Sequence, residues 1–506
     1  MRVLLIHPPL TSHPADFPTP EPPLGLAYIA AVLEEKGYEV AILDALSLGI
    51  QNVEQVGELV RVGLSALDIK KYVEDFKPDV VGIGAAYSAL AADSHKMARL
   101  VKQVNPEILT VFGGAHASAL PALVLQDKNV DVVVVGEGEI TFLELVQARE
   151  KGNGIFEIPG TVVRKIDRVV ANSQRPYIEN LDSLPLPARH LLPMEVYTQR
   201  PSFIRDYSLR QPRTSMISSR GCPRDCVFCS IHSVWGHSWR KRPAISVVDE
   251  MELLIEKYKI REIAFMDDNL TLDRQRMADI CDEILRRKMD IRWCTPNGIA
   301  IWALDEELLR KMKASGCWKV TFGIEVAAPE TQKFIGKIIN LEKADRIIKY
   351  ANSIGLWTHA TFIIGFPYES MDSIEQTVKY ALDSDLDIAV FFIATPYPGS
   401  KLYKICKEED LLSSDNSFWS PVRPAWRTKF LTREQLERVI VRASLGFMTS
   451  RVFKFLNPLR IKKKVKSWED IKFMVKLAKS VIGVEIVARK HGRIQHHLKH
   501  SKIWWS

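Results

Sequence analysis

Three cysteines stand close together in residues 221–230, GCPRDCVFCS, at positions Cys222, Cys226 and Cys229. The 506-residue chain has only seven cysteines, so three within eight positions indicate a metal-binding site rather than three small apolar residues. Thiolates bind zinc or iron–sulfur clusters, and both sites usually have four ligands. His232 follows Cys229 closely and would complete a Cys3His zinc site. A four-iron cluster held by only three thiolates would instead keep one iron open to a small molecule.

The other cysteines are scattered and form neither a disulfide framework nor a second cluster motif, so we expect a reducing, cytoplasmic environment. The first residues, MRVLLIHPP, end at prolines and are typical of a strand rather than a signal peptide. No apolar stretch approaches the ~20 residues needed to span a bilayer. A hydrophobic content of 46% with 26% charged residues is typical of a globular protein. The scattered cysteines are Cys281, Cys294, Cys317 and Cys406.

Residues 1–150 alternate short apolar runs with helical patterns. The apolar runs are MRVLLIH, EVAILDA, VVGIGAA, LTVFGGA and DVVVVGE, and stretches such as SHKMARLVKQVN separate them. Strands that are apolar throughout are buried on both faces, which predicts a parallel sheet with helices on each side. The predicted fold of this domain is therefore α/β and flavodoxin-like (Rossmann-like), with ligands bound at the carboxyl ends of its strands.

A Pro-rich segment, residues 151–205, is predicted to be a linker. The alternation then resumes for six rounds in residues 206–420, with the strand-like runs SMISSRG, EIAFMDD, IRWCTPN, KVTFGIE, HATFIIGF and IAVFFIA. Six successive βα units predict a partial (β/α)6 barrel of the TIM type, with its chemistry at the carboxyl ends of the strands. The three cysteines follow the first of these strands, where this rule places an active site. Cys294 and Cys317 flank the third and fourth strands and are candidates for the barrel mouth.

The cysteine spacing, with the aromatic Phe228 just before the last cysteine, resembles the signature loop of the radical SAM superfamily. Four further segments resemble that family in the same order along the chain: IAFMDDNLTLD, FGIEV, FIIGFPYES and PYPGSKLY. The resemblance implies that the three cysteines bind a [4Fe-4S] cluster whose open iron chelates S-adenosylmethionine (SAM). It also implies an electron donor such as ferredoxin or flavodoxin, which lets the cluster cleave SAM to methionine and a 5′-deoxyadenosyl radical. The residues implied for SAM binding are Phe228, Asp267, Asp268, Glu325 and Gly365.

The first 150 residues resemble the cobalamin-binding domain that precedes the barrel in one subgroup of this family. The resemblance rests on SAL after the third strand, GG after the fourth and GEGE after the fifth. Glycines at such turns let the backbone lie close to a flat macrocycle. The alternative is a plain flavodoxin-like domain with glycines in its turns. The residues implied for cobalamin binding are Ser88, Leu90, Gly113, Gly114, Gly136, Glu137 and Gly138.

The Asp-x-His-x-x-Gly motif, whose histidine ligates cobalt in many cobalamin proteins, is absent from the loop HPPLTSHPADFPTPEPP. His7 and His13 are near this loop but lack the spacing. Asp93 and His95 lie after the third strand instead, with Ala98 in place of the glycine, and are typical of a helix start. The subgroup that the chain resembles usually lacks the motif too, so we expect cobalamin to bind without a protein histidine.

Residues 421–506 are strongly basic, with 21 Lys and Arg against 5 Asp and Glu, although the whole chain carries a net charge of only +8. Apolar residues at helical spacing with lysines opposite predict amphipathic helices. A helical cap on the barrel and a peripheral contact with the inner face of the membrane both fit this pattern. Nucleic-acid binding is disfavoured, because the spacing is amphipathic and no base-stacking motif is present.

These features together predict a cobalamin-dependent radical SAM enzyme that acts on an unactivated carbon. In the resembled family the commonest outcome is methyl transfer from methylcobalamin, whereas some relatives form rings, oxidise or rearrange their substrates. The basic tail favours an apolar small-molecule substrate such as a lipid or isoprenoid. A zinc-stabilised interaction protein and a nucleic-acid modifier are the alternatives from other classes.

Overall fold

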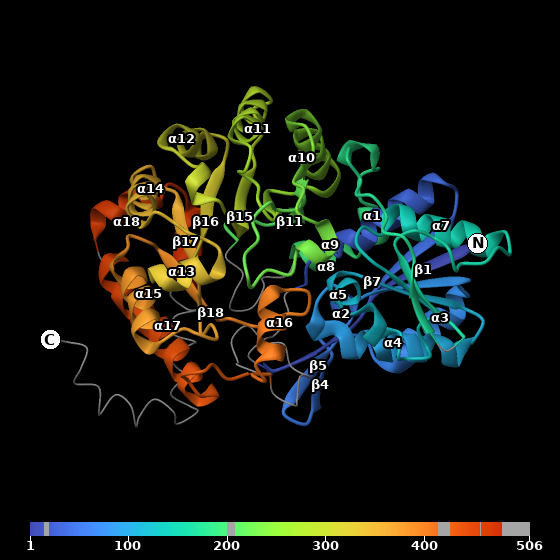
Figure 1. Ribbon diagram of the computed structural model, residues 1–506. Helices are drawn as coiled ribbons and strands as arrows, with labels where there is room; N and C mark the ends of the chain where they lie inside the picture. The colour runs from blue at the N-terminus through green and yellow to red at the C-terminus, as the bar shows by residue number, and fades with distance from the viewer. Residues whose placement is uncertain (15–19, 167, 200–207, 413–425, 456, 478–506) are drawn as a thin grey trace.

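The computed structural model of the protein describes residues 1–14, 20–166, 168–199, 208–412, 426–455 and 457–477. Two α/β units lie side by side, an amino-terminal sheet domain and a barrel-like domain that follows it (Figure 1). Every helix within these ranges is too short or too polar to span a bilayer. The predicted tail extends beyond them, since residues 421–425 and 478–506 lie outside the described part.

The first domain is built on a parallel sheet with the spatial order β3-β1-β6-β7-β8. One face packs against α1 (Leu24–Glu35) and α7 (Glu139–Glu150), and the other against α3 (Ala66–Phe76) and α4 (Ala91–Val104). This arrangement confirms the flavodoxin-like prediction and explains why the strands are apolar throughout. The strands are β1 (Arg2–His7), β3 (Glu39–Asp44), β6 (Val80–Gly84), β7 (Leu109–Gly113) and β8 (Val132–Val134). Four short helices connect them: α2 (Ala45–Leu48), η2 (Ser88–Leu90), α5 (Ala115–Ala119) and α6 (Pro121–Val124).

Part of the predicted linker belongs to this sheet instead. Strands β9 (Thr161–Lys165) and β10 (Arg168–Ala171) form an antiparallel hairpin that extends the sheet beyond β8. Both strands are short and β10 is largely exposed, so neither has the continuous apolar run that marks the central strands. The rest of the segment contains η3 (Leu181–Ser183), η4 (Arg189–Leu191) and α8 (Met194–Gln199). A small antiparallel sheet of β2 (Leu10–Ser12), β5 (Leu59–Val62) and β4 (Val53–Val56) lies at one side of the domain.

The second domain is an open parallel sheet whose six strands follow one another in chain order, as the partial barrel predicts. Side-chain caps define where several of its helices begin: Asp273, Asp305, Asn340 and Ser370 each accept a hydrogen bond from a backbone N–H three residues later. The strands are β11 (Arg213–Met216), β14 (Glu262–Phe265), β15 (Arg292–Ile299), β16 (Cys317–Glu325), β17 (Trp357–Ile364) and β18 (Ile388–Ile393). The helices are α10 (Ala244–Tyr258), α11 (Arg274–Arg286), η5 (Ile301–Ala303), α12 (Glu306–Ala314), α13 (Pro329–Ile335), α14 (Leu341–Ser353), α15 (Met371–Asp383) and α16 (Lys401–Glu408).

The described part of the basic tail packs against the barrel. Helix α17 (Arg433–Phe455) lies on β18 and α15, and α18 (Pro458–Lys464) follows it. Beyond α18, the ring of Phe473 lies 5.0 Å from that of Trp318 and 4.8 Å from that of Trp357. These tryptophans stand at the beginning of β16 and β17, so the segment around Phe473 covers the amino-terminal end of the barrel.

Two predictions need correction at this end of the barrel. Cys294 and Cys317 do not reach the mouth, because both lie near the amino-terminal ends of β15 and β16 and are buried. Part of the tail's positive charge is also internal rather than presented to a partner. Arg460 pairs with Asp385 and Asp387, and buried Lys464 pairs with Asp387 as well.

Candidate active site between the two domains

The three predicted cluster cysteines lie in one loop, residues 221–239, which we call the cysteine loop. It begins after β12 (Ser219–Arg220) and ends at β13 (Arg240–Lys241), and these two strands pair in antiparallel fashion. The loop follows β11, the first strand of the barrel, and therefore lies at the carboxyl end of the sheet, where barrels of this type carry their chemistry. It contains one short helix, α9 (His232–Trp235).

Backbone hydrogen bonds fix the middle of the cysteine loop to the barrel. The Val227 N–H donates to the carbonyl of Ile335 at 3.0 Å, and the Leu402 N–H donates to the carbonyl of Val227 at 2.8 Å. A turn between the second and third cysteines is closed by the Cys229 N–H, which donates to the Cys226 carbonyl at 3.0 Å. The positions of the cysteines are therefore set by α13 and α16, which lie far apart in sequence.

The geometry does not fit the zinc alternative. Tetrahedral zinc brings its sulfur ligands to about 3.8 Å from one another. Within the described residues, one set of three metal-ligating groups has all its ligand atoms within 4.8 Å, and it consists of Asp225, His232 and His237 rather than the cysteines. The two imidazole rings of that set are stacked, with centroids 3.8 Å apart and planes only 17° apart, so one ion cannot lie in the plane of both. His232 Nε2 lies instead 3.0 Å from the carbonyl oxygen of Cys222.

Burial affects the protonation of two of the three cysteines. Burial raises the pKa of Cys226, and it raises the pKa of Cys229 to about 12. A thiol bound to a cationic metal is deprotonated, so bound iron would reverse this effect of burial. The three sulfur atoms are not all within 4.8 Å of one another, which fits thiolates on separate irons, and three cysteines leave one iron free to bind SAM. The donor set therefore fits a [4Fe-4S] cluster.

The two neighbouring aspartates predicted for SAM binding have different surroundings. Asp267 is buried and accepts hydrogen bonds from the Ser218 N–H and from the hydroxyls of Ser218 and Ser219, so it holds the chain that leads into the loop. Asp268 is partly exposed and accepts from the Gly221 N–H at 3.2 Å. Burial, with a smaller contribution from Asp267, raises the pKa of Asp268 to about 7. Asp268 is therefore the one of the pair that faces the cysteine loop.

Glu325 lies at the carboxyl end of β16, as predicted, and is only 7% exposed. Its carboxylate accepts from Lys337 Nζ at 2.8 Å and from the Thr361 hydroxyl at 3.2 Å. Sequence reasoning missed Lys337, because nothing in its local sequence marks it. It also missed Asn269, whose amide nitrogen lies 3.8 Å from Cys222 Sγ and follows directly after the predicted acidic pair.

The segment around Gly365 is held by a buried acid. Glu369 accepts from the N–H of Gly365 at 2.6 Å and of Phe366 at 3.1 Å. Gly365 has a φ of +84°, and a Cβ there would lie 2.7 Å from a methyl group of Leu436 in α17. The tail therefore occupies the space that a side chain would need. Predicted Phe228 packs nearby, with its ring 6.1 Å from that of Phe366.

The glycines predicted for cobalamin binding lie at the carboxyl ends of β7 and β8. At Gly114, with a φ of +107°, a Cβ would lie 2.8 Å from the backbone of Ala85, so only glycine fits this approach of two strand ends. A Cβ on Gly113 would meet nothing within 4 Å, which leaves this edge open. Gly136 and Gly138 continue the same edge before α7, and a Cβ on Gly136 would approach the carbonyl of Val234 in the cysteine loop to 3.5 Å.

The other cobalamin predictions have mixed outcomes. The Ser88 hydroxyl lies at the sheet edge, 3.0 Å from Nδ1 of His116, whereas Leu90 is buried in the domain. Burial, followed by the charge of His95, lowers the pKa of His116 to about 4, so this imidazole stays neutral. Sequence reasoning missed His116, although it directly follows the two glycines. His7 lies at the end of β1 with its ring 2.9 Å from buried Asp44.

Glu137 does not face the open sheet edge. It is buried and accepts hydrogen bonds from Arg220 at 2.7 Å, from Arg240 at 2.7 and 2.8 Å, and from the Ile178 N–H at 2.8 Å. These three partners occupy both carboxylate oxygens. The prediction that Glu137 contacts cobalamin is therefore corrected, because the side chain connects the first domain to the two ends of the cysteine loop.

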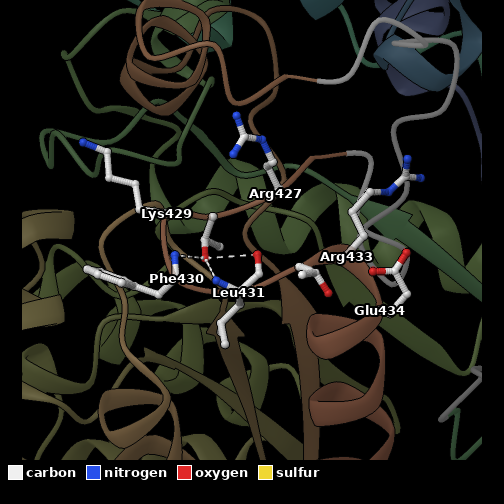
Figure 2. Close-up of a pocket in the computed structure, with 8 residues that line it drawn as sticks. Arg427, Lys429, Phe430, Leu431, Arg433 and Glu434 are labelled. Carbon is white, nitrogen blue, oxygen red and sulfur yellow. Dashed lines mark hydrogen bonds between the residues drawn. The ribbon is translucent and has the colours of Figure 1, made fainter.

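A separate groove of about 370 Å³ is formed by residues 427–434, which precede and begin α17 (Figure 2). The Thr428 hydroxyl accepts from the N–H groups of Phe430 and Leu431, and Lys429 reaches Glu409 at 2.7 Å. None of the predicted site residues lines this groove. It is a surface feature of the loop rather than part of the candidate site.

Sequence comparisons agree with this two-domain arrangement. The B12 binding domain family matches residues 15–146, and the radical SAM superfamily matches residues 216–381. An uncharacterized methyltransferase of Pyrococcus horikoshii is 36% identical over 450 residues, which cover 88% of this chain and 92% of that protein. The cytidylyl-2-hydroxyethylphosphonate methyltransferase of Streptomyces wedmorensis is 36% identical over 451 residues, covering 83% of this chain and 84% of that protein.

Comparison of the fold with solved structures agrees with these sequence comparisons. The radical SAM methyltransferase TsrM of Kitasatospora setae, solved with cobalamin and a [4Fe-4S] cluster bound, superposes with a TM-score of 0.66 at 19% identity and covers 88% of this chain and 85% of that one. At this identity the likeness concerns the fold, whereas the relatives at 36% identity span nearly the whole chain. The chain therefore belongs to the cobalamin-dependent radical SAM enzymes, the family whose cofactors are cobalamin, a [4Fe-4S] cluster and SAM.

Proposed function

We propose that this protein is a methyltransferase that uses a [4Fe-4S] cluster on Cys222, Cys226 and Cys229, with cobalamin at the carboxyl edge of the first sheet. The observation that supports it most is the meeting of the two predicted cofactor sites. Helix α5, which follows the glycines after β7, contacts α9 in the cysteine loop, and both lie between the two domains (Figure 1). Cobalamin and SAM would thus face one shared space, as methyl transfer between them requires.

The chain's own residues would position these groups. Asp268 and Asn269 contact the amino-terminal end of the cysteine loop, and Glu325 presents a fixed carboxylate at the mouth of the barrel. The open edge at Gly113 would accept the flat face of the macrocycle. When bound, the cluster supplies the electron that cleaves SAM, from a donor such as ferredoxin or flavodoxin, and cobalamin carries the methyl group. The close packing of the two domains would exclude water and oxygen from the radical.

The acceptor in this proposal is a small molecule, and the sequence favours an apolar one. The tail adds no direct support for a lipid, because its described residues pack on the barrel itself, with Leu436 beside Gly365 and Phe473 against Trp318 and Trp357 at the opposite end. Similarity to the cytidylyl-2-hydroxyethylphosphonate methyltransferase over most of the chain supports a nucleotide-linked acceptor instead. The test of the proposed function therefore includes an apolar acceptor and a nucleotide-linked acceptor.

A peripheral membrane contact of the tail is a separate part of the proposal. Leu459 and Trp468 are 72% and 66% exposed, and exposed lysines such as Lys462 and Lys466 lie close to them in sequence. Apolar side chains among lysines favour an anionic lipid surface. Flotation with vesicles containing anionic lipid should carry the wild-type protein, and Trp468→Asp should reduce this binding. Equal flotation of the two proteins would count against the membrane contact.

Methyl transfer is tested with SAM that carries a labelled methyl group. The reconstituted protein is incubated anaerobically with reductant and either an isoprenoid or cytidylyl-2-hydroxyethylphosphonate. Label transferred to one acceptor identifies the reaction and the acceptor class together. A product without label, formed along with 5′-deoxyadenosine, would replace methyl transfer by ring formation, oxidation or rearrangement.

A further inference from the structure

Two arginines face each other at the base of the cysteine loop. Arg220 and Arg240 are directly opposite partners in the short β12–β13 pair, one immediately before the loop and the other immediately after it. Both are buried, at 4% and 5% exposure. Like charges directly opposite each other on paired strands are destabilising, and burial strengthens the repulsion. Without a countercharge, this buried pair would be unfavourable at the point where the loop must close.

The first domain supplies the countercharge. Glu137 accepts from both arginines, at 2.7 Å from Arg220 and at 2.7 and 2.8 Å from Arg240, and Glu139 accepts from Arg220 at 2.6 Å. Two carboxylates thus balance two guanidinium groups, and all four side chains are buried. Among the residues that the structure describes, Glu137 is the acid that touches both ends of the loop.

Aromatic rings cover the charged groups on their remaining sides. The guanidinium of Arg220 lies 4.9 Å from the ring of Trp235 and 5.2 Å from that of Tyr28, and that of Arg240 lies 5.0 Å from Tyr177. Tyr28 and Tyr177 come from outside the barrel, and Trp235 comes from the cysteine loop itself. Water is thereby kept away, so no solvent would replace a missing carboxylate.

We infer that Glu137 is a positioning residue for the iron–sulfur cluster: docking of the cobalamin-binding domain closes the loop that carries Cys222, Cys226 and Cys229. The inference rests on the proposed assignment of the cluster to these cysteines. It gives the first domain a second role, since the domain that holds one cofactor also completes the site of the other. Partners that orient metal ligands without touching the metal typically contribute about 10–100-fold to metal affinity.

The test compares iron retention in the full-length, reconstituted protein and its variants. Glu137→Gln should lose iron to a chelator about tenfold faster than wild type, while it binds cobalamin with unchanged affinity. Asp387→Asn is the matched control, because Asp387 is an equally buried acid between two cations, Arg460 and Lys464, at the opposite end of the barrel. Its iron should leave at the wild-type rate, even if its thermal stability falls as much as that of Glu137→Gln.

A double variant separates charge balance from general damage. Glu137→Gln with Arg240→Gln removes one charge of each sign and leaves Arg220 paired with Glu139, so iron retention should recover toward wild type. The inference is overturned if Glu137→Gln keeps its iron, if Asp387→Asn loses it equally fast, or if the double variant loses it no more slowly than the single one. Loss of cobalamin with retention of iron would also overturn it. Wild-type protein that takes up no iron would overturn the cluster assignment as well.

Discussion

Lys337 Nζ lies 2.8 Å from Glu325 Oε1 at the carboxyl end of β16. Glu325 has a φ of +65°, a conformation that costs free energy for any residue other than glycine. Thr361 holds the second carboxylate oxygen at 3.2 Å. The carboxylate is thus held in a strained backbone position by two partners, which is a typical property of a residue that must present its side chain to a ligand.

Replacing Lys337 with methionine should weaken SAM binding to the reconstituted protein about tenfold, because Glu325 would lose the cation that balances it in a mostly buried place. Equilibrium dialysis with labelled SAM measures this. Lys343→Met is the matched control, since Lys343 donates to the Trp302 carbonyl nearby but does not touch Glu325. Equal affinities for all three proteins would show that the ion pair does not serve SAM binding.

Stability should fall with rising pH because of Glu369. Burial raises the pKa of Glu369 to about 8, above the value of about 4.3 in an unfolded chain. The folded protein therefore keeps a proton that the unfolded chain releases. This stabilising contribution is complete below about pH 4, decreases through the interval up to about pH 8 and is absent above it, at about 1.4 kcal/mol per pH unit for one group. Urea midpoints at several pH values measure the decrease.

Glu369→Gln provides the comparison for that measurement. Glutamine can accept from the N–H groups of Gly365 and Phe366 but does not titrate, so the decrease between pH 5 and pH 8 should be smaller in the variant. Buried Glu262, whose pKa burial raises to about 7, contributes a decrease of the same sign in both proteins. Parallel stability profiles for wild type and Glu369→Gln would contradict the assignment.

The tail should stabilise the barrel through Lys464. This buried lysine donates to Asp387, Asn352 and the Leu356 carbonyl, and burial lowers its pKa to about 8 against the opposing effect of Asp387. Lys464→Met should lower the free energy of unfolding by about 3–5 kcal/mol, since it leaves Asp387 with one cation fewer. Exposed Lys462→Met should change it by less than about 0.5 kcal/mol. Thermal unfolding of both variants decides whether this part of the tail is structural.

The central strands of the first sheet that are buried on both faces were predictable, since β1 and β6 contain uninterrupted apolar runs. The hairpin of β9 and β10 was not, because β9 has only a short buried run and β10 is largely exposed. The cysteine motif predicted the location of the candidate site, but not which residues hydrogen-bond to the cysteine loop. Which of Asp267 and Asp268 faces the loop depends on the positions of Ser218 and Gly221, and no rule of spacing contains that information.

Glu137 illustrates that local sequence does not predict a contact between two domains. Its place in GEGE predicts a residue at a ligand-binding edge, and the neighbouring glycines do lie there. Its two arginine partners are 83 and 103 residues away in another domain, so only the docked structure reveals that the carboxylate is already occupied. Local sequence predicts which edge of a sheet carries the chemistry, whereas the orientation of each side chain depends on distant contacts.

The most direct test of the account is anaerobic purification with iron and cobalt analysis, followed by reductant and SAM, with Cys222→Ala and Cys281→Ala prepared in parallel. The account predicts about four irons and one cobalamin per wild-type chain, with 5′-deoxyadenosine and S-adenosylhomocysteine formed together. Cys222→Ala should lose iron and both products, whereas Cys281→Ala, altered at a buried position of helix α11, should keep them. Zinc in place of iron with neither product, or full iron and activity in Cys222→Ala, would contradict it.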